Sequence, residues 1–161
     1  MRPSRTLKPR IGFAPVLGIA LMAPAPVQGQ GTATPEADLE ARARAIHESV
    51  ITIDTHDDIS SNLATAESDP GQREGRQVTL PKMREGGLDV AFFIVYVGQT
   101  ERTPENYAAA KAEAIKMFEA IHRMTDELYP EEIGLARSPD DVERLHAEGK
   151  LAAAIGIENG Y

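Results

Sequence analysis

Apolar positions along the chain fall into two patterns, one typical of helices and one typical of strands. Between residues 35 and 50 they recur at intervals of three or four, at Leu39, Ala43, Ile46 and Val50. This spacing predicts an amphipathic helix. Residues 51–54 follow directly as a strand, ITID, that ends in acidic residues. Residues 88–98 and 151–157 are nearly continuous apolar runs, which predict strands buried on both faces, as in parallel sheets.

Two further helices are predicted by their capping residues. Thr103-Pro104 and Ser138-Pro139 have the order of an N-cap and a first helical residue. The longer helix should run to about residue 128, with an inward stripe formed by Tyr107, Ala114, Phe118, Ile121 and Leu128. The shorter helix should end at Gly149 in a left-handed conformation.

The order of these elements is helix, strand, strand, long helix, short helix, strand. Residues 64–77, after the first strand, are polar and rich in turn formers, so we expect an exposed, mobile loop there. Helices between apolar strands indicate an α/β fold with a parallel sheet and right-handed crossovers. We assign residues 30–161 to this fold.

The first 29 residues have the layout of a secretory signal peptide. A basic leader is followed by an apolar run at 11–24 and by small residues up to Ala33. The run contains two prolines and is shorter than the roughly 20 residues of a membrane span, so a permanent anchor is the weaker alternative. We expect cleavage near Gly29, or after Ala33, and export to the periplasm or the extracellular space.

Charge and cysteine content exclude several classes of function. Residues 30–161 carry 13 basic residues against all 25 acidic residues, a formal charge of −12. This balance argues against a nucleic-acid partner, because phosphate binding needs clustered Lys and Arg. The chain has no cysteine, which excludes disulfides, thiolate catalysis and a lipid anchor on cysteine.

The segment from His56 to Asp58 is the first candidate functional site. Alternate residues of a strand share a face, so His56 and Asp58 can point at one spot. A nitrogen ligand and a hard oxygen ligand held by one strand suit zinc. On spacing alone, the alternative is a strand-end turn in which Asp57 and Asp58 cap backbone amides.

Glu158 follows the last predicted strand, where it either starts a turn with Asn159-Gly160 or contributes to the same site. The carboxyl ends of parallel strands meet at one edge of an α/β sheet, where sites are built. Two strand ends that carry His56, Asp58 and Glu158 are therefore better evidence for a site than either end alone. The other histidines lie inside predicted helices and are expected to be solvated or packed, namely His47, His122 and His146.

Four landmarks, in order, resemble those of the membrane (renal) dipeptidase family. IDTHDDI is similar to that family's I-D-G-H-N-D-L, and LPKMREGGLDVAFFIVYV to its L-P-R-L-R-x-G-G-V with the aromatic strand that follows. AIHRMTDELYPE resembles I-H-R-M…Y-P, and IGIENGY resembles I-G-V-E-G-G-H. The resemblance covers about residues 40–161.

The resemblance implies a zinc metallopeptidase with an amidohydrolase-type (β/α)8 barrel, of the TIM type. His56 and Asp58 would bind the first of two zinc ions, and Glu158 would bridge both. A hydroxide between the ions would attack the peptide bond of a dipeptide or similar small amide. A homodimer of the full-length protein is left open.

The sequence departs from the family pattern without losing a ligand. Thr55 stands where the family usually has Gly, and Asp57 where it often has Asn. Ala91 replaces a frequent Gln, and residues 159–161 read NGY where GGH is common. The changes at Ala91 and Tyr161 leave the substrate contacts open.

We expect residues 30–161 to form the N-terminal portion of an incomplete barrel, because a closed barrel needs roughly 200 residues or more. The histidines of the second metal and the substrate-binding residues cannot be assigned in it. The isolated chain should be marginally stable, poorly soluble and inactive, with weak metal affinity. Two alternative functions remain: another amidohydrolase-type hydrolase, acting on lactams, cyclic amides or esters, and a non-catalytic secreted α/β binding protein.

Overall fold

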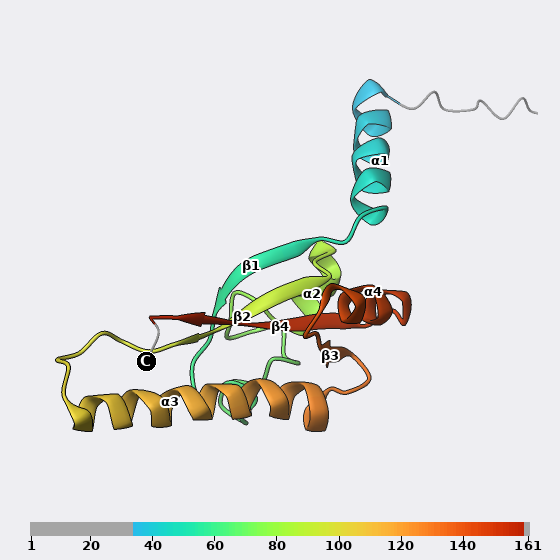
Figure 1. Cartoon of the computed structure of the whole chain (residues 1–161). Helices are drawn as coiled ribbons and strands as arrows, with labels where there is room; N and C mark the ends of the chain where they lie inside the picture. Colours follow the sequence, from blue (N-terminus) through green and yellow to red (C-terminus); the bar gives the residue numbers. More distant parts are fainter. Residues whose placement is uncertain (1–33, 160–161) are drawn as a thin grey trace, which may run out of the picture. The chain divides into compact units, whose positions relative to one another are not determined.

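The computed structural model describes residues 34–159, in which four parallel strands form one sheet (Figure 1). The elements in chain order are α1 (Pro35–Glu48), β1 (Ile53–Asp58), α2 (Leu80–Gly86), β2 (Val90–Tyr96), α3 (Pro104–His122), the π-helix η1 (Arg123–Leu128), β3 (Ile133–Leu135), α4 (Pro139–Ala147) and β4 (Leu151–Glu158). The predicted signal peptide at residues 1–29 and Tyr161 lie outside the described residues.

The strands are arranged in the order β1-β2-β4-β3. β2 and β4 form the longest ladder, from Val90 opposite Ala152 to Tyr96 opposite Glu158. Because every pairing is parallel, the carboxyl ends of β1, β2 and β4 lie at the same edge of the sheet. The parallel α/β architecture expected from the sequence is confirmed. β1, however, starts two residues later than predicted and continues through the acidic cluster to Asp58.

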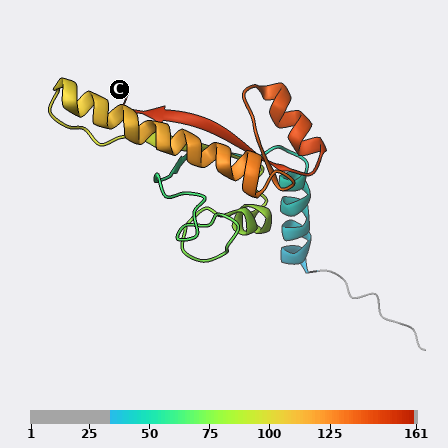
Figure 2. The ribbon, with the colours of Figure 1, turned by 90° about the horizontal axis from the view of Figure 1, so that it is seen from below.

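One face of the sheet packs against α3, which runs along it in Figures 1 and 2. Alternate residues of β2, including Phe93 and Val95, are buried there with Met117 and Ile121. This alternation is what the period of two in a strand requires. The larger hydrophobic cluster therefore lies between this face of the sheet and the layer that contains α3, the β1–α2 loop and α2, and a smaller cluster contains Val90 and Leu145.

The predicted inward stripe of the long helix is only partly correct. Ala114 and Ile121 are buried, but Tyr107 and Leu128 are exposed. Tyr107 lies in the first turn of α3, beyond the buried part of the helix. Leu128 lies in η1, where the wider π-helical turn changes the direction of the side chains, and Met124 is buried instead.

Helix α1 confirms the helix predicted at residues 35–50, but it contributes nothing to the core. Every residue of Pro35–Glu48 is exposed, including the apolar Leu39 and Ile46. Thr34 caps it by accepting a hydrogen bond from the Ala37 amide at 3.2 Å. Across residues 34–159, no helix combines the length and the apolar character that a membrane crossing requires.

The loop between β1 and α2 is anchored to the helical layer, so the expectation of an exposed loop at residues 64–77 is only partly correct. Leu63 and Ala64 are buried, and their carbonyl oxygens accept hydrogen bonds from Arg123 at 3.0 and 2.8 Å. Further along, Tyr129 Oη donates to Asp69 Oδ1 at 2.5 Å. A side chain on Gly71 would overlap the Tyr129 ring and hydroxyl, so this close approach requires glycine.

The Tyr129–Asp69 contact predicts a measurable contribution to stability. The hydrogen bond raises the pKa of Tyr129 to about 12 and lowers the pKa of Asp69. Tyr129→Phe should reduce the free energy of unfolding by about 1 kcal/mol at neutral pH, because the bond to a charged acceptor is lost. Tyr107→Phe, at an exposed tyrosine, is the matched control, and urea denaturation is the measurement.

The pKa shifts of Asp69 and Tyr129 determine how the difference in unfolding free energy between the wild type and Tyr129→Phe depends on pH. The stabilisation from Asp69 is present above its unfolded pKa of about 3.8 and is lost as the pH falls through its lower folded value. The stabilisation from Tyr129 is present below its unfolded pKa of about 10 and is lost as the pH rises through 12. The stabilising role of this hydrogen bond would be contradicted if the wild type were no more stable than Tyr129→Phe at pH 7, or if its extra stability grew below pH 4.

Candidate metal centre

The tip of β1 is shaped by an irregularity in its pairing with β2. Asp54 lies opposite Ala91 and Asp57 opposite Phe93, so three steps along β1 match two steps along β2. Within this bulge, Asp54 Oδ1 accepts a hydrogen bond from the His56 amide at 2.9 Å. Bulges redirect side chains and often occur beside active sites. This one holds the backbone from which His56 projects.

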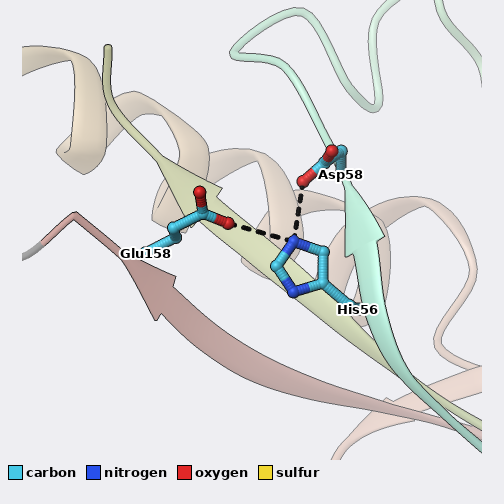
Figure 3. A group of neighbouring side chains, drawn as sticks. All are labelled: His56, Asp58 and Glu158. Carbon is cyan, nitrogen blue, oxygen red and sulfur yellow. Dashed lines mark hydrogen bonds and ion pairs between the residues drawn. The ribbon is translucent and has the colours of Figure 1, made fainter. Parts of the chain in front are cut away.

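His56, Asp58 and Glu158 converge at the carboxyl edge of the sheet (Figure 3). His56 Nε2 lies 3.1 Å from Asp58 Oδ1 and 3.0 Å from Glu158 Oε2. His56 and Asp58 project from β1 and Glu158 from β4, with β2 between them in the sheet. Their side chains are 52%, 74% and 41% exposed, respectively. The site is therefore formed by two strand ends and is open to solvent.

Gly156 helps to shape the sheet face that carries Glu158. It lies two residues before Glu158 and opposite Ile94 of β2. A Cβ atom at position 156 would overlap Ile94 Cδ1. Glycine therefore allows Ile94 to pack across β4 on the same face as the Glu158 carboxylate.

The donor set and the spacing of these three residues fit a zinc ion. Zinc binds imidazole nitrogen and carboxylate oxygen at about 2.0–2.2 Å in a tetrahedron, which places neighbouring ligand atoms roughly 3.3 Å apart. The two distances from His56 Nε2 are close to that value. One ring nitrogen carries at most one proton and cannot fully satisfy two carboxylates. A cation bound among the three would satisfy all of them.

Asp57 lies between the two candidate ligands of β1 in the sequence but is on the opposite, buried side of the strand. It is 8% exposed, and Oδ2 has no hydrogen-bond partner within the described part of the chain. Burial raises the pKa of Asp57 to about 6, against the opposing effect of the Arg76 charge. Asp58 contacts His56 in place of a backbone amide. The contacts of Asp58 therefore do not support the alternative in which it caps backbone amides in a strand-end turn.

The other histidines lie in helices, as predicted, away from this cluster. His122 Nδ1 lies 2.9 Å from Asp126 Oδ2, and His146 Nδ1 lies 3.4 Å from Asp89 Oδ1. Within residues 34–159, one group of three or more potential ligands has its atoms within 4.8 Å of one another, and it is the group at the ends of β1 and β4.

A cavity of about 670 Å³ lies elsewhere, against the amino-terminal half of the sheet. Its lining is mostly apolar and includes Ile53, Val90, Phe92 and Ala154. None of the three converging residues lines it, although Phe92 and Ala154 share a sheet face with Glu158. The cavity and the three converging residues are therefore separate features of the sheet.

Comparison with known proteins identifies the family. Residues 40–161 match the family model described as membrane dipeptidase (Peptidase family M19). The chain belongs to this family. It is similar to the dipeptidase ataJ of Aspergillus terreus, with 30% identity over 86 residues. This aligned region covers 51% of the chain. It also resembles the crystal structure of the probable dipeptidase PvdM from Pseudomonas aeruginosa, with a TM-score of 0.68 and 22% identity over 77% of the chain.

These matches confirm the family and the TIM-type fold class expected from the sequence. The chain spans 21% of the length of the Aspergillus protein and 32% of the Pseudomonas structure. The described sheet β1-β2-β4-β3 is therefore the sheet of a chain that matches only part of these longer proteins.

The sequence analysis missed two residues that support the candidate ligands. Asp54 binds the His56 amide, and its position two residues before His56 is the signal that could have indicated this bond. Arg76 donates to the Asp58 carbonyl oxygen over a long 3.5 Å contact and lies in the turn-rich loop. No local pattern indicates that second contact, because 18 residues separate the partners.

The converging side chains predict how metal binding should respond to substitution. Glu158→Gln keeps the shape of the side chain but removes its charge and a good oxygen ligand, and His56→Ala removes the central nitrogen. Both should lower the zinc content of the purified full-length protein at least several-fold, with a much smaller change in melting temperature. His122→Ala is the matched control at a helical histidine. Wild-type zinc content in both site variants would show that these residues are not ligands.

Proposed function

We propose that the full-length protein is a zinc-dependent dipeptidase that hydrolyses the peptide bond of dipeptides. The observation that carries this proposal is the convergence of His56, Asp58 and Glu158 at the strand ends of a chain from the membrane dipeptidase family. The names of the two proteins given above, a dipeptidase and a probable dipeptidase, support the same substrate class.

Each of the three residues has a distinct part in this proposal. His56 supplies a neutral nitrogen ligand, and Asp58 supplies a carboxylate from the same strand face. Glu158 has one oxygen directed at His56 and a second oxygen available to another ion, which suits a bridging ligand. When bound, a zinc pair would polarise the substrate carbonyl and activate a water molecule. Asp58 and Glu158 would offset part of the positive charge of the metals.

The test is hydrolysis of a set of dipeptides by the full-length protein before and after removal of metal. We expect activity to be lost on chelation and restored by zinc, because the ligands have no equivalent role without a cation. Undiminished turnover after verified metal removal would rule out the mechanism.

The same assay separates the alternative functions. A panel of lactams, cyclic amides and esters beside the dipeptides tests for another amidohydrolase-type reaction. Faster turnover of any of these substrates would correct the proposed substrate class. A protein that binds no metal and hydrolyses none of them would be a binding protein.

We also propose that the protein is exported, on the basis of the basic, apolar and small-residue segments of residues 1–29. N-terminal sequencing of protein recovered outside the cytoplasm should give a chain that begins after Gly29 or after Ala33. An exported chain that retains residues 1–29, or a chain found only in the cytoplasm, would contradict this proposal.

A further inference from the structure

Asn159, the residue after Glu158, has an unusual backbone conformation. Its φ is +57°, in the left-handed region that residues other than glycine rarely adopt. Asparagine tolerates this region better than most residues because its short polar side chain can form local hydrogen bonds. The conformation turns the chain sharply as β4 ends.

The Asn159 side chain is bonded to the segment that follows β2. Its Nδ2 donates to the Val97 carbonyl oxygen at 3.2 Å, and its Oδ1 accepts from Gln99 Nε2 at 3.2 Å. The backbone pairing of β2 with β4 ends just before this point, with Tyr96 opposite Glu158. The side-chain amide of Asn159 therefore extends the hydrogen bonding between β2 and β4 by one residue beyond the backbone ladder.

Glu158 is thus held on both sides. The strand ladder fixes its backbone on the amino-terminal side, and Asn159 fixes it on the carboxyl-terminal side. Strand ends fray when nothing follows the last ladder pair. A carboxylate that must remain 3.0 Å from His56 Nε2 needs such a restraint.

We propose that Asn159 is a positioning residue of the metal centre, which holds the Glu158 carboxylate in place through its bonds to Val97 and Gln99. The inference rests on the proposed metal centre. A glycine at this position would permit the same φ but would leave the end of β4 tied by the backbone alone. The identity of residue 159 therefore sets how tightly the site binds its ion.

The test compares metal affinity in variants of the full-length protein. Asn159→Gly keeps the backbone conformation accessible and removes both side-chain bonds, whereas Gln99→Ala removes one bond and leaves β4 unchanged. We expect Asn159→Gly to weaken Co²⁺ binding about 10- to 100-fold, the range typical for residues that support a ligand, and Gln99→Ala to weaken it less. The visible spectrum of bound Co²⁺ should change in both variants.

Asn106→Ala is the matched control. Asn106, in the first turn of α3, donates from its side chain to the Glu101 carbonyl oxygen at 2.8 Å and takes no part in the hydrogen bonds that join Asn159 to Val97 and Gln99. It should leave the affinity and the spectrum at wild-type values. The double variant should bind Co²⁺ as weakly as Asn159→Gly alone, because the side chain that Gln99 bonds to is already absent.

Each outcome has one meaning. Wild-type Co²⁺ affinity and spectrum in Asn159→Gly would overturn the inference while leaving the metal centre intact. If Asn159→Gly melts at a much lower temperature without metal, Gln99→Ala decides, and unchanged Co²⁺ binding in that variant overturns the inference. A wild-type protein without His56-dependent Co²⁺ binding would overturn the proposed function and the inference with it.

Discussion

The register between β2 and β4 is the constraint on which the site depends. Along this ladder, alternate residues of β4 face α3, while Gly156 and Glu158 face the other way. A slip of one residue would turn Glu158 towards the core and Ile157 towards His56. Burial of Phe93 and Val95 against α3 opposes that slip, because it would expose the apolar face of β2. The hydrophobic core thus fixes a register, and the register places a carboxylate.

The carboxyl edge concentrates negative charge, and each carboxylate is accommodated differently. Asp54 accepts a hydrogen bond from a backbone amide. Asp57 is buried, which raises its pKa, and the positive charge of Arg76 partly opposes this rise. Asp58 and Glu158 converge within 4.8 Å of each other at the imidazole. Two unit charges at that separation repel by roughly 1–3 kcal/mol in a partly exposed setting. A divalent cation reverses the sign of this local energy, which is the physical reason to expect one there.

Local signals predicted much of the fold because they depend on neighbouring residues alone. Thr103 and Ser138 cap α3 and α4 through bonds to the amides three residues later, as their sequence context indicates. A similar device, Thr79 with Pro81 two residues later and a left-handed Gly87, starts and ends α2, yet this seven-residue helix was not predicted. The three residues of β3 are too few to show a period. The anchoring of the β1–α2 loop joins residues about 60 positions apart, such as Ala64 and Arg123, and local patterns carry no information about it.

In the candidate site, too, local patterns predict the features that depend on neighbouring residues and not those that depend on residues far apart in the sequence. The pairing of His56 with Asp58 follows from the period of a strand, so two residues of spacing were enough to propose it. The approach of Glu158 to His56 depends on the strand order, and the family resemblance supplied what the spacing could not. The contacts of Asn159 could be found in neither way, since its residue type indicates a turn and the family often has glycine there. Its partners, Val97 and Gln99, are identified by the pairing of β2 with β4. Sequence patterns thus indicate which side chains are suited to bind an ion, whereas the restraints that keep them in place emerge from the assembled sheet.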